Sequence, residues 1–220
     1  MSDGELRFPR ITQLYEQYLA EQDTAVYVQQ VNAIYTAATL ERLACSEHRE
    51  TRRAAVLTLG LVGDYESNHV LGRALVDRDR GVRSLAENSI RAVWRRAGNV
   101  RQREQLQTVA DFVEMKRYTE AVERATELIE QAPWFAEAWN QRAIAHYHVE
   151  RFSDAIRDCR QALEINPYHF GAAAGMGQCH LRQKDQLSAL ECFRRALRLN
   201  PSLENVRAQV IYLQKSLQGE

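Results

Sequence analysis

Small residues and prolines recur at a constant interval in the second half of the chain. The residues in phase are Ala121, Ala155 and Ala189, together with Pro133, Pro167 and Pro201. A constant period of about 34 residues indicates a repeat protein. Because proline excludes the helical state for the residue before it, each period predicts a helix, a turn and a second helix that ends before the proline. In the middle period the helices are expected at about residues 136–149 and 153–165.

The last two periods resemble the tetratricopeptide repeat in the positions of their large and small residues. The matching residues are Trp139, Phe152, Ala155, Ala162 and Pro167 in the middle period, and Gly177, Ala189, Phe193, Ala196 and Pro201 in the last. Residues 102–135 form a degenerate first unit, because Ala125 and Leu128 stand where the family usually has an aromatic residue and an alanine. An apolar stripe along residues 202–217 resembles the capping helix that closes such arrays.

A second and slightly shorter period is present upstream, where residues 51–62 align with residues 82–93. This part resembles the HEAT-like repeats of phycobilin lyases, most clearly over residues 50–63, and residues 10–34 are expected to add one or two capping helices. The two resemblances imply an all-α fold, an α-solenoid of stacked helix pairs. Residues 1–99 are expected to hold the N-terminal cap helices and HEAT-like repeats, and residues 100–220 the three tetratricopeptide units and their capping helix.

Charge is balanced over the whole chain, with 29 lysines and arginines against 29 acidic residues, so no overall field attracts polyanions. Residues 41–103 nevertheless hold 13 arginines against 8 acidic residues. A possible basic patch there consists of Arg52, Arg53, Arg83, Arg91, Arg95 and Arg96. It supports one alternative function, a nucleic-acid-binding HEAT-repeat module. We favour instead the pairing of Arg52 and Arg83 with acids such as Asp64 and Asp79, so nucleic acid is not an expected partner.

No set of residues with a catalytic or metal-binding spacing is visible in the sequence. His146 and His148, the closest histidines, point to opposite sides of a helix, and the four cysteines include no C-x-x-C pair. We therefore predict no enzyme, no metal and no cofactor, and four buried free thiols. An enzyme of the phycobilin-lyase kind is a further alternative that rests on the repeat type alone. Without an apolar leader or membrane-length segment, the chain is expected to be cytoplasmic and without a membrane partner.

The tetratricopeptide resemblance implies a concave groove lined by the first helix of each unit. The expected function is a non-catalytic scaffold or adaptor that binds a peptide segment or a partner helix of another protein there. The predicted partner-binding residues are Asn140, Gln141, Ile144, Tyr147, His148, Gly171, Ala174, Gly175, Gln178, Arg182 and Tyr212. The sequence predicts no oligomeric state.

Two interpretations of the small groove residues Gly171, Ala174 and Gly175 stay open. They either leave a hollow for a partner side chain or let adjacent helices pack closely. The family's charged clamp for the C-terminal carboxylate of heat-shock chaperones needs Lys and Asn at positions occupied here by Leu106 and Ala110, and Arg where Gly175 stands. A chaperone tail is therefore not an expected partner.

Overall fold

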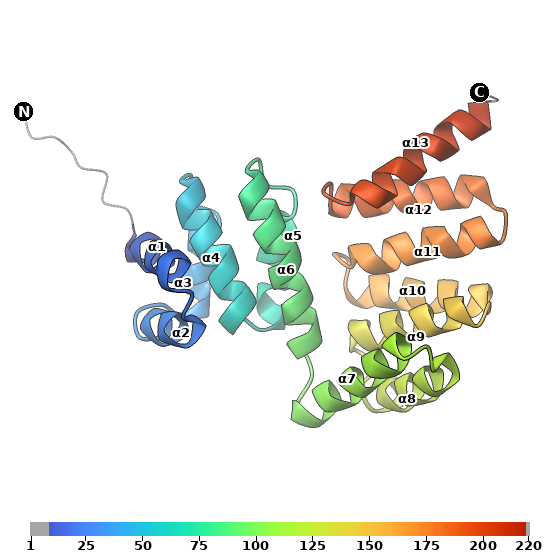
Figure 1. Cartoon of the computed structure of the whole chain (residues 1–220), viewed down its shortest axis with the longest axis horizontal. Helices are drawn as coiled ribbons and strands as arrows, with labels where there is room; N and C mark the ends of the chain where they lie inside the picture. Colours follow the sequence, from blue (N-terminus) through green and yellow to red (C-terminus); the bar gives the residue numbers. More distant parts are fainter. Residues whose placement is uncertain (1–8, 219–220) are drawn as a thin grey trace, which may run out of the picture. The chain divides into compact units, whose positions relative to one another are not determined.

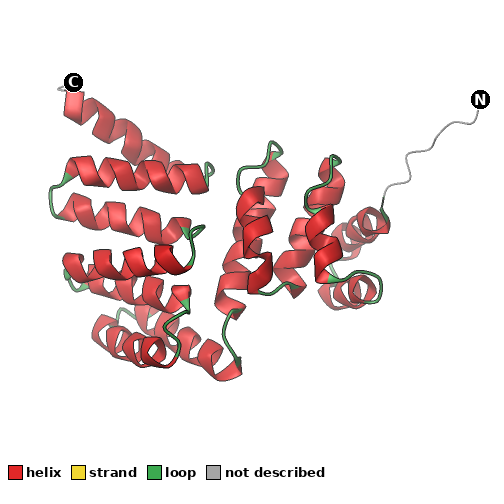
Figure 2. Ribbon diagram, turned by 180° about the vertical axis from the view of Figure 1, so that it is seen from behind, coloured by secondary structure: helices red, strands yellow, loops and turns green. Residues whose placement is uncertain are grey.

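The computed structural model describes residues 9–218, and every regular element in that range is a helix (Figures 1 and 2). The predicted all-α fold is confirmed. The chain divides into two compact units, Met1–Val93 and Trp94–Glu220. The dividing point lies inside helix α6 (Arg80–Arg96), and the predicted change of repeat type at residues 99 and 100 stays a prediction.

The first unit is built from short helix pairs. Its elements before α6 are α1 (Arg10–Glu21), α2 (Thr24–Asn32), α3 (Ala37–Leu43), α4 (Arg49–Val62), the 3₁₀ helix η1 (Tyr65–Ser67) and α5 (Asn68–Ala74). Helices α1 and α2 both pack on α4, and Ile11, Tyr27 and Leu59, one from each of the three helices, are at most 2% exposed. The Tyr27 hydroxyl lies 2.6 Å from Thr58 Oγ1, and burial raises the pKa of Tyr27 to about 12. Residues 10–34 thus contain two helices, in agreement with the one or two predicted there, and their role as caps of an array stays a prediction.

The upstream period has a physical counterpart in two arginines. Arg52 Nη1 donates to the carbonyl oxygens of Ser46 and Glu47, both at 2.9 Å. Arg83, one period later, donates through Nη1 to the carbonyls of Asp77 and Arg78, at 2.8 and 3.3 Å. These two carbonyls stand at the positions equivalent to Ser46 and Glu47. In each helix pair one arginine therefore holds the turn that precedes its own helix.

The second unit stacks helix pairs of nearly equal length (Figure 1). After the end of α6 its helices are α7 (Val100–Glu114), α8 (Tyr118–Gln131), α9 (Ala136–His148), α10 (Phe152–Ile165), α11 (Phe170–Arg182), α12 (Gln186–Leu199) and α13 (Glu204–Gln218). The helices predicted for the middle period agree closely with α9 and α10. Helix α9 contacts both α7 and α11, and α8, α10 and α12 pack against these three. We call α7, α9 and α11 the inner helices.

The turn inside each pair has the same backbone conformation. Lys116, Glu150 and Lys184, which stand at equivalent positions of the three periods, have φ values of 60°, 61° and 62°. These values lie in the left-handed region that non-glycine residues rarely adopt. The degenerate unit therefore makes the same turn as the two regular ones, although its sequence departs from the pattern.

This turn leads to a prediction for Lys116. Lys116→Gly should raise the free energy of unfolding by about 0.5–1 kcal/mol, because relief of the strain at a Cβ exceeds the entropy that glycine adds to the unfolded chain. Urea unfolding measures the difference. Lys116→Ala, which keeps the Cβ, should bring no gain, and a glycine variant less stable than the alanine variant would contradict this expectation.

Candidate partner-binding groove

A pocket of about 170 Å³ lies between the inner helices α7 and α9. Its lining residues are Arg95, Arg103, Leu106, Gln107, Ala110, Glu114, Glu137 and Gln141. Leu106 and Ala110 form an apolar wall, while arginines and glutamates supply charges of both signs. Such a mixed lining suits a peptide with apolar and polar side chains. The predicted partner-binding residues centred on α9 and α11 and did not include Arg103 or Glu114, while Arg95 was predicted as part of the basic patch.

Glu137 is a buried carboxylate at the edge of this pocket. Its Oε1 accepts from the amides of Gln141 at 2.9 Å and Asn140 at 3.3 Å, and its Oε2 lies 3.0 Å from His169 Nε2. Burial alone raises the pKa of Glu137, but hydrogen bonds from His169, Gln141 and Asn140 outweigh it and hold the pKa below its ordinary value. The carboxylate is therefore ionised near neutral pH. Asn140 and Gln141, which were predicted to contact a partner, each donate an amide hydrogen bond to Glu137.

His169 connects Glu137 to the start of α11. Its Nδ1 accepts from the backbone N–H of Ala172 at 3.0 Å, so Nε2 carries the proton that is donated to Glu137. The ring of Trp94 stacks on His169 at a centroid distance of 4.4 Å and lies 5.3 Å from that of Phe170. Trp94, at the start of the second unit, is therefore packed on the first turn of α11.

Tyr147 and Arg182 lie close together at the C-terminal ends of the inner helices α9 and α11. The Arg182 guanidinium lies 4.9 Å from the Phe152 ring centroid and 5.6 Å from that of Tyr147, and Nη2 donates to Glu150 at 2.8 Å. Because the Arg182 side chain is about half exposed, this cluster offers both a cation and an aromatic surface to solvent.

The other predicted groove residues on α9, α11 and α13 differ in exposure. His148 is exposed and stacks on Tyr118 with ring centroids 4.4 Å apart. Ile144 and Gln178 are half-buried, and Tyr212 of α13 is 64% exposed. The role of these residues in binding a partner stays a prediction.

The small residues of α11 face neighbouring side chains. A Cβ added at Gly175 would lie 3.5 Å from Cys159 Sγ of α10, and one at Gly171 would lie 3.5 Å from the ring of His169. Ala174 packs against the core of the unit. Because 3.5 Å is an ordinary van der Waals contact, neither glycine is required for close helix packing, and both interpretations of the small residues stay open. Gly175 does lie beside α10.

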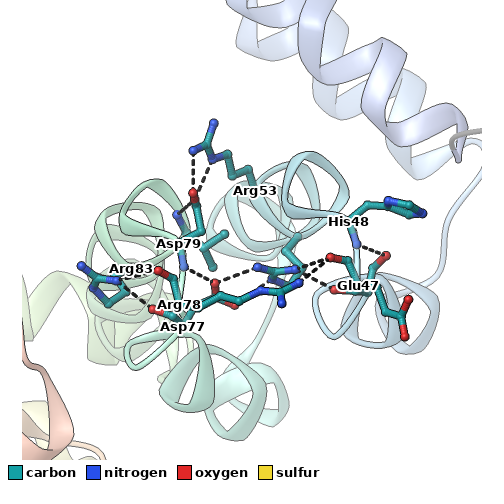
Figure 3. Close-up of polar contacts among 10 residues, drawn as sticks. Glu47, His48, Arg53, Asp77, Arg78, Asp79 and Arg83 are labelled. Atoms are coloured by element: carbon teal, nitrogen blue, oxygen red, sulfur yellow. Dashed lines mark hydrogen bonds and ion pairs between the residues drawn. The ribbon is translucent and has the colours of Figure 1, made fainter.

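The predicted basic patch is largely engaged in structural contacts (Figure 3). Arg52 forms a bidentate pair with Asp77 at 2.7 and 2.9 Å, and Arg53 forms one with Asp79 at 2.8 Å, which lowers the pKa of Asp79 to about 2. Arg83 binds backbone carbonyls. The predicted pairing with an acid is therefore present for Arg52, although with Asp77 and not Asp64, because the turn that contains Asp77 passes beside it. For Arg83 the prediction is wrong: its contacts among the described residues are with backbone carbonyls, and Asp79 pairs with Arg53 instead.

The remaining patch residues do not gather into one surface of the first unit. Arg91 pairs with Glu87 at 3.2 Å on α6. Arg95 and Arg96 belong to the second unit, where Arg95 lines the groove pocket. Burial, together with the charge of Arg103, lowers the pKa of Arg96.

The second unit contains another pocket, of about 430 Å³, which lies between α8, α9 and α10. Arg142 forms a bidentate pair with Asp158 at 2.8 Å, and its Nη1 donates to Thr126 Oγ1 at 3.0 Å. His146 is buried beside them, with Nε2 3.7 Å from Asp158 Oδ2, and burial lowers its pKa although Asp158 opposes this. This cluster was not predicted from the sequence, because Arg142 and Asp158 lie on different, antiparallel helices.

Within the described part of the chain, no three His, Cys, Asp or Glu side chains group as metal ligands. The four cysteines are free thiols, as predicted. The prediction that all are buried is wrong for Cys45, which follows α3 in an exposed turn. Between residues 9 and 218, no helix has the length and apolar character of a membrane span.

Comparison with known proteins identifies the repeats. The tetratricopeptide repeat family matches residues 136–169 and 171–203. A TPR repeat-containing protein of Rhizobium etli is 29% identical over 143 residues, 65% of this chain and 70% of that protein. The SGT1 homologue of Bos taurus is 32% identical over 99 residues, 45% of this chain. The chain spans only 29% of the length of that homologue.

Two solved structures share the fold over about half of this chain. The first TPR domain of Spaghetti (RPAP3), bound to an HSP90 peptide, has a TM-score of 0.51 at 19% identity and covers 53% of this chain and 93% of its own. The TPR2B domain of yeast Sti1, in complex with an Hsp70 peptide, has a TM-score of 0.50 at 22% identity and covers 54% and 99%. The helix pairs of the chain from residue 136 to residue 203 are therefore tetratricopeptide repeats.

Proposed function

We propose that this protein is a non-catalytic adaptor that binds a peptide segment or a helix of another protein along its inner helices. The observation that carries the proposal is the pocket between α7 and α9, which combines an apolar wall with arginines and glutamates. The related domains of Spaghetti and Sti1, captured with peptides of HSP90 and Hsp70, support a peptide as the ligand class.

The chemistry of the groove favours a ligand other than a bare C-terminal carboxylate. Leu106 and Ala110, on the wall of the pocket, offer no charge or hydrogen bond, and Arg103 and Glu114 both line it. An internal segment with an apolar side chain flanked by polar ones fits this lining.

A displayed peptide library selected on the immobilised protein tests the proposal, with calorimetry on the selected peptides. Arg103→Glu reverses a charge of the pocket and Gln107→Trp fills it, and both residues are exposed, so the fold should survive. Each should weaken binding by about 1–3 kcal/mol, the range of an interface anchor. Arg194→Glu, at an exposed position of the outer helix α12, is the matched control and should leave binding unchanged. Selected peptides that bind both groove variants as tightly as the original protein would refute the proposal.

The two alternatives have simple tests. A nucleic-acid-binding module should lose affinity for DNA or RNA steeply between low and moderate salt. A bilin mixed with a phycobilin-lyase-like enzyme should change its absorbance. The pairing of Arg52 and Arg53 with aspartates leaves little of the predicted basic patch for phosphates, and this favours the adaptor.

The HEAT-like character of the first unit is also a proposal. It is supported by the equivalent carbonyl contacts of Arg52 and Arg83, which stand one upstream period apart. The absence of catalysis and the cytoplasmic location remain predictions from the sequence.

A further inference from the structure

The first unit contains a pocket of about 370 Å³ between the turn after α3 and helix α5. Among the residues lining it are Cys45, Ser46, Arg52, Arg73, Asp77 and Arg78. The pocket lies outside the unit that carries the groove, so a ligand bound here would be independent of the proposed function.

One side of this pocket is a rigid ion pair. The Arg52 and Asp77 side chains are 6% and 13% exposed and form a bidentate contact, and Arg52 also holds the carbonyls of Ser46 and Glu47. Asp77 Oδ1 accepts from the backbone N–H of Asp79 at 2.7 Å. The two turns are therefore fixed to each other (Figure 3). This pair cancels its own charge and positions the residues around it.

The other two arginines of the pocket, Arg73 and Arg78, form no ion pair with a described carboxylate that would neutralise their charge. Arg73 is exposed and forms no ion pair with any described residue, and Arg78 donates only to the Glu47 carbonyl, at 3.0 Å. Three arginines against one aspartate leave the pocket with a charge of +2. The groove pocket has two arginines against two glutamates, and the pocket of Arg142 three arginines against two aspartates. Of the three pockets, this one carries the largest uncompensated positive charge.

The polar groups of the pocket suit a doubly charged oxyanion. Guanidinium groups match the oxygens of phosphate in geometry and charge. The Ser46 hydroxyl oxygen accepts from the His48 backbone N–H at 3.3 Å, which leaves its proton available for donation. We propose that this pocket binds the dianion of a phosphate monoester, with Arg73 and Arg78 as its charged donors and Ser46 as a neutral one. The phosphate belongs either to a small metabolite or to a phosphorylated side chain of a protein.

Cys45 provides a reporter at the pocket. It is the one exposed thiol among the four, and burial raises the pKa of Cys159, Cys179 and Cys192 and slows their reaction. The rate of Cys45 alkylation by neutral iodoacetamide is measured in the full chain with increasing inorganic phosphate. Chloride holds the ionic strength constant, and Cys45→Ser gives the background. Phosphate should protect Cys45 in a saturable way, while chloride alone should not.

Variants assign the protection to the pocket. Arg73→Gln and Arg78→Gln should each weaken protection by about tenfold or more, the effect of losing one charge-assisted hydrogen bond. Arg80→Gln, at the exposed start of α6 and outside the pocket lining, is the matched control and should match the original protein. Because Arg73 makes no ion pair with a described residue, its variant should keep the original melting temperature. Loss of protection in Arg73→Gln with an unchanged melting temperature would support the site.

Two results would overturn the proposal: protection by phosphate no stronger than by chloride, or protection that both arginine variants retain. If phosphate protects Cys45 and the arginine variants reduce this protection, free phosphoserine and a phosphoserine peptide distinguish the two sources of the phosphate. Tighter protection by the peptide assigns the pocket to a phosphorylated protein, and equal protection assigns it to a small phosphate ester. Either outcome of this comparison between phosphoserine and the peptide supports a phosphate monoester as the ligand of the pocket.

Discussion

The Gly177→Ala variant is expected to lower the free energy of unfolding by about 1–3 kcal/mol, although alanine is the better helix former. A Cβ at this position of α11 would lie 2.6 Å from Cε1 and 2.7 Å from Cδ1 of Phe193 in α12. Phe193 is fully buried in the core of the unit, so its ring moves only if its neighbours move. The cost of overpacking should therefore exceed the gain of about 1 kcal/mol in helix propensity.

Gly175→Ala is the matched control, two positions away on the same helix. Its Cβ would meet Cys159 Sγ at 3.5 Å, an ordinary van der Waals contact, so this variant should be more stable by about 0.5–1 kcal/mol. Urea unfolding of both variants measures the contrast. Equal effects at the two positions would show that Gly177 does not set the distance between α11 and α12.

The repeats were predictable because they rest on local chemistry. Proline after a helix and small residues at helix contacts recur with the period of the structure. Gly177, one of the residues that carry the resemblance, lies against Phe193 of the neighbouring helix. The upstream period likewise marked Arg52 and Arg83 as equivalent, and the structure gives them equivalent carbonyl contacts.

The identity of polar partners was harder to predict, because it depends on how turns and antiparallel helices approach one another. Arg52 reaches Asp77 across 25 positions, and Arg142 reaches Asp158 across 16. The bonds from Asn140 and Gln141 to Glu137 are different, since spacings of three and four on one helix were visible in the sequence. The resemblance predicted that Asn140 and Gln141 contact a partner, and the prediction did not include Glu137, to which both donate.

Removing the Arg142 guanidinium should have a large effect on the stability of the second unit. Arg142→Met is expected to lower the free energy of unfolding by about 3 kcal/mol at neutral pH, because it leaves the Asp158 carboxylate buried without a cation. The Arg142 side chain is 16% exposed and that of Asp158 is 6% exposed, so water compensates only weakly. Urea unfolding measures the loss. In the double variant Arg142→Met/Asp158→Leu no charge is stranded, and stability should return to within about 1 kcal/mol of the original protein.

The pH dependence of Arg142→Met tests whether the stranded charge is the cause. In the original protein burial holds the pKa of His146 below its ordinary value of 6.5. Without the guanidinium, Asp158, 3.7 Å away, should raise the pKa of His146 above that value in the folded state. Such a group adds stability below the unfolded pKa and loses it as the pH rises through the folded one. Arg142→Met should therefore lose less stability at about pH 5.5 than at about pH 8, and the double variant should lack this difference. An equal loss at both pH values would mean that packing of the Arg142 chain on Trp139 and Thr126, and not the unpaired carboxylate, accounts for the cost.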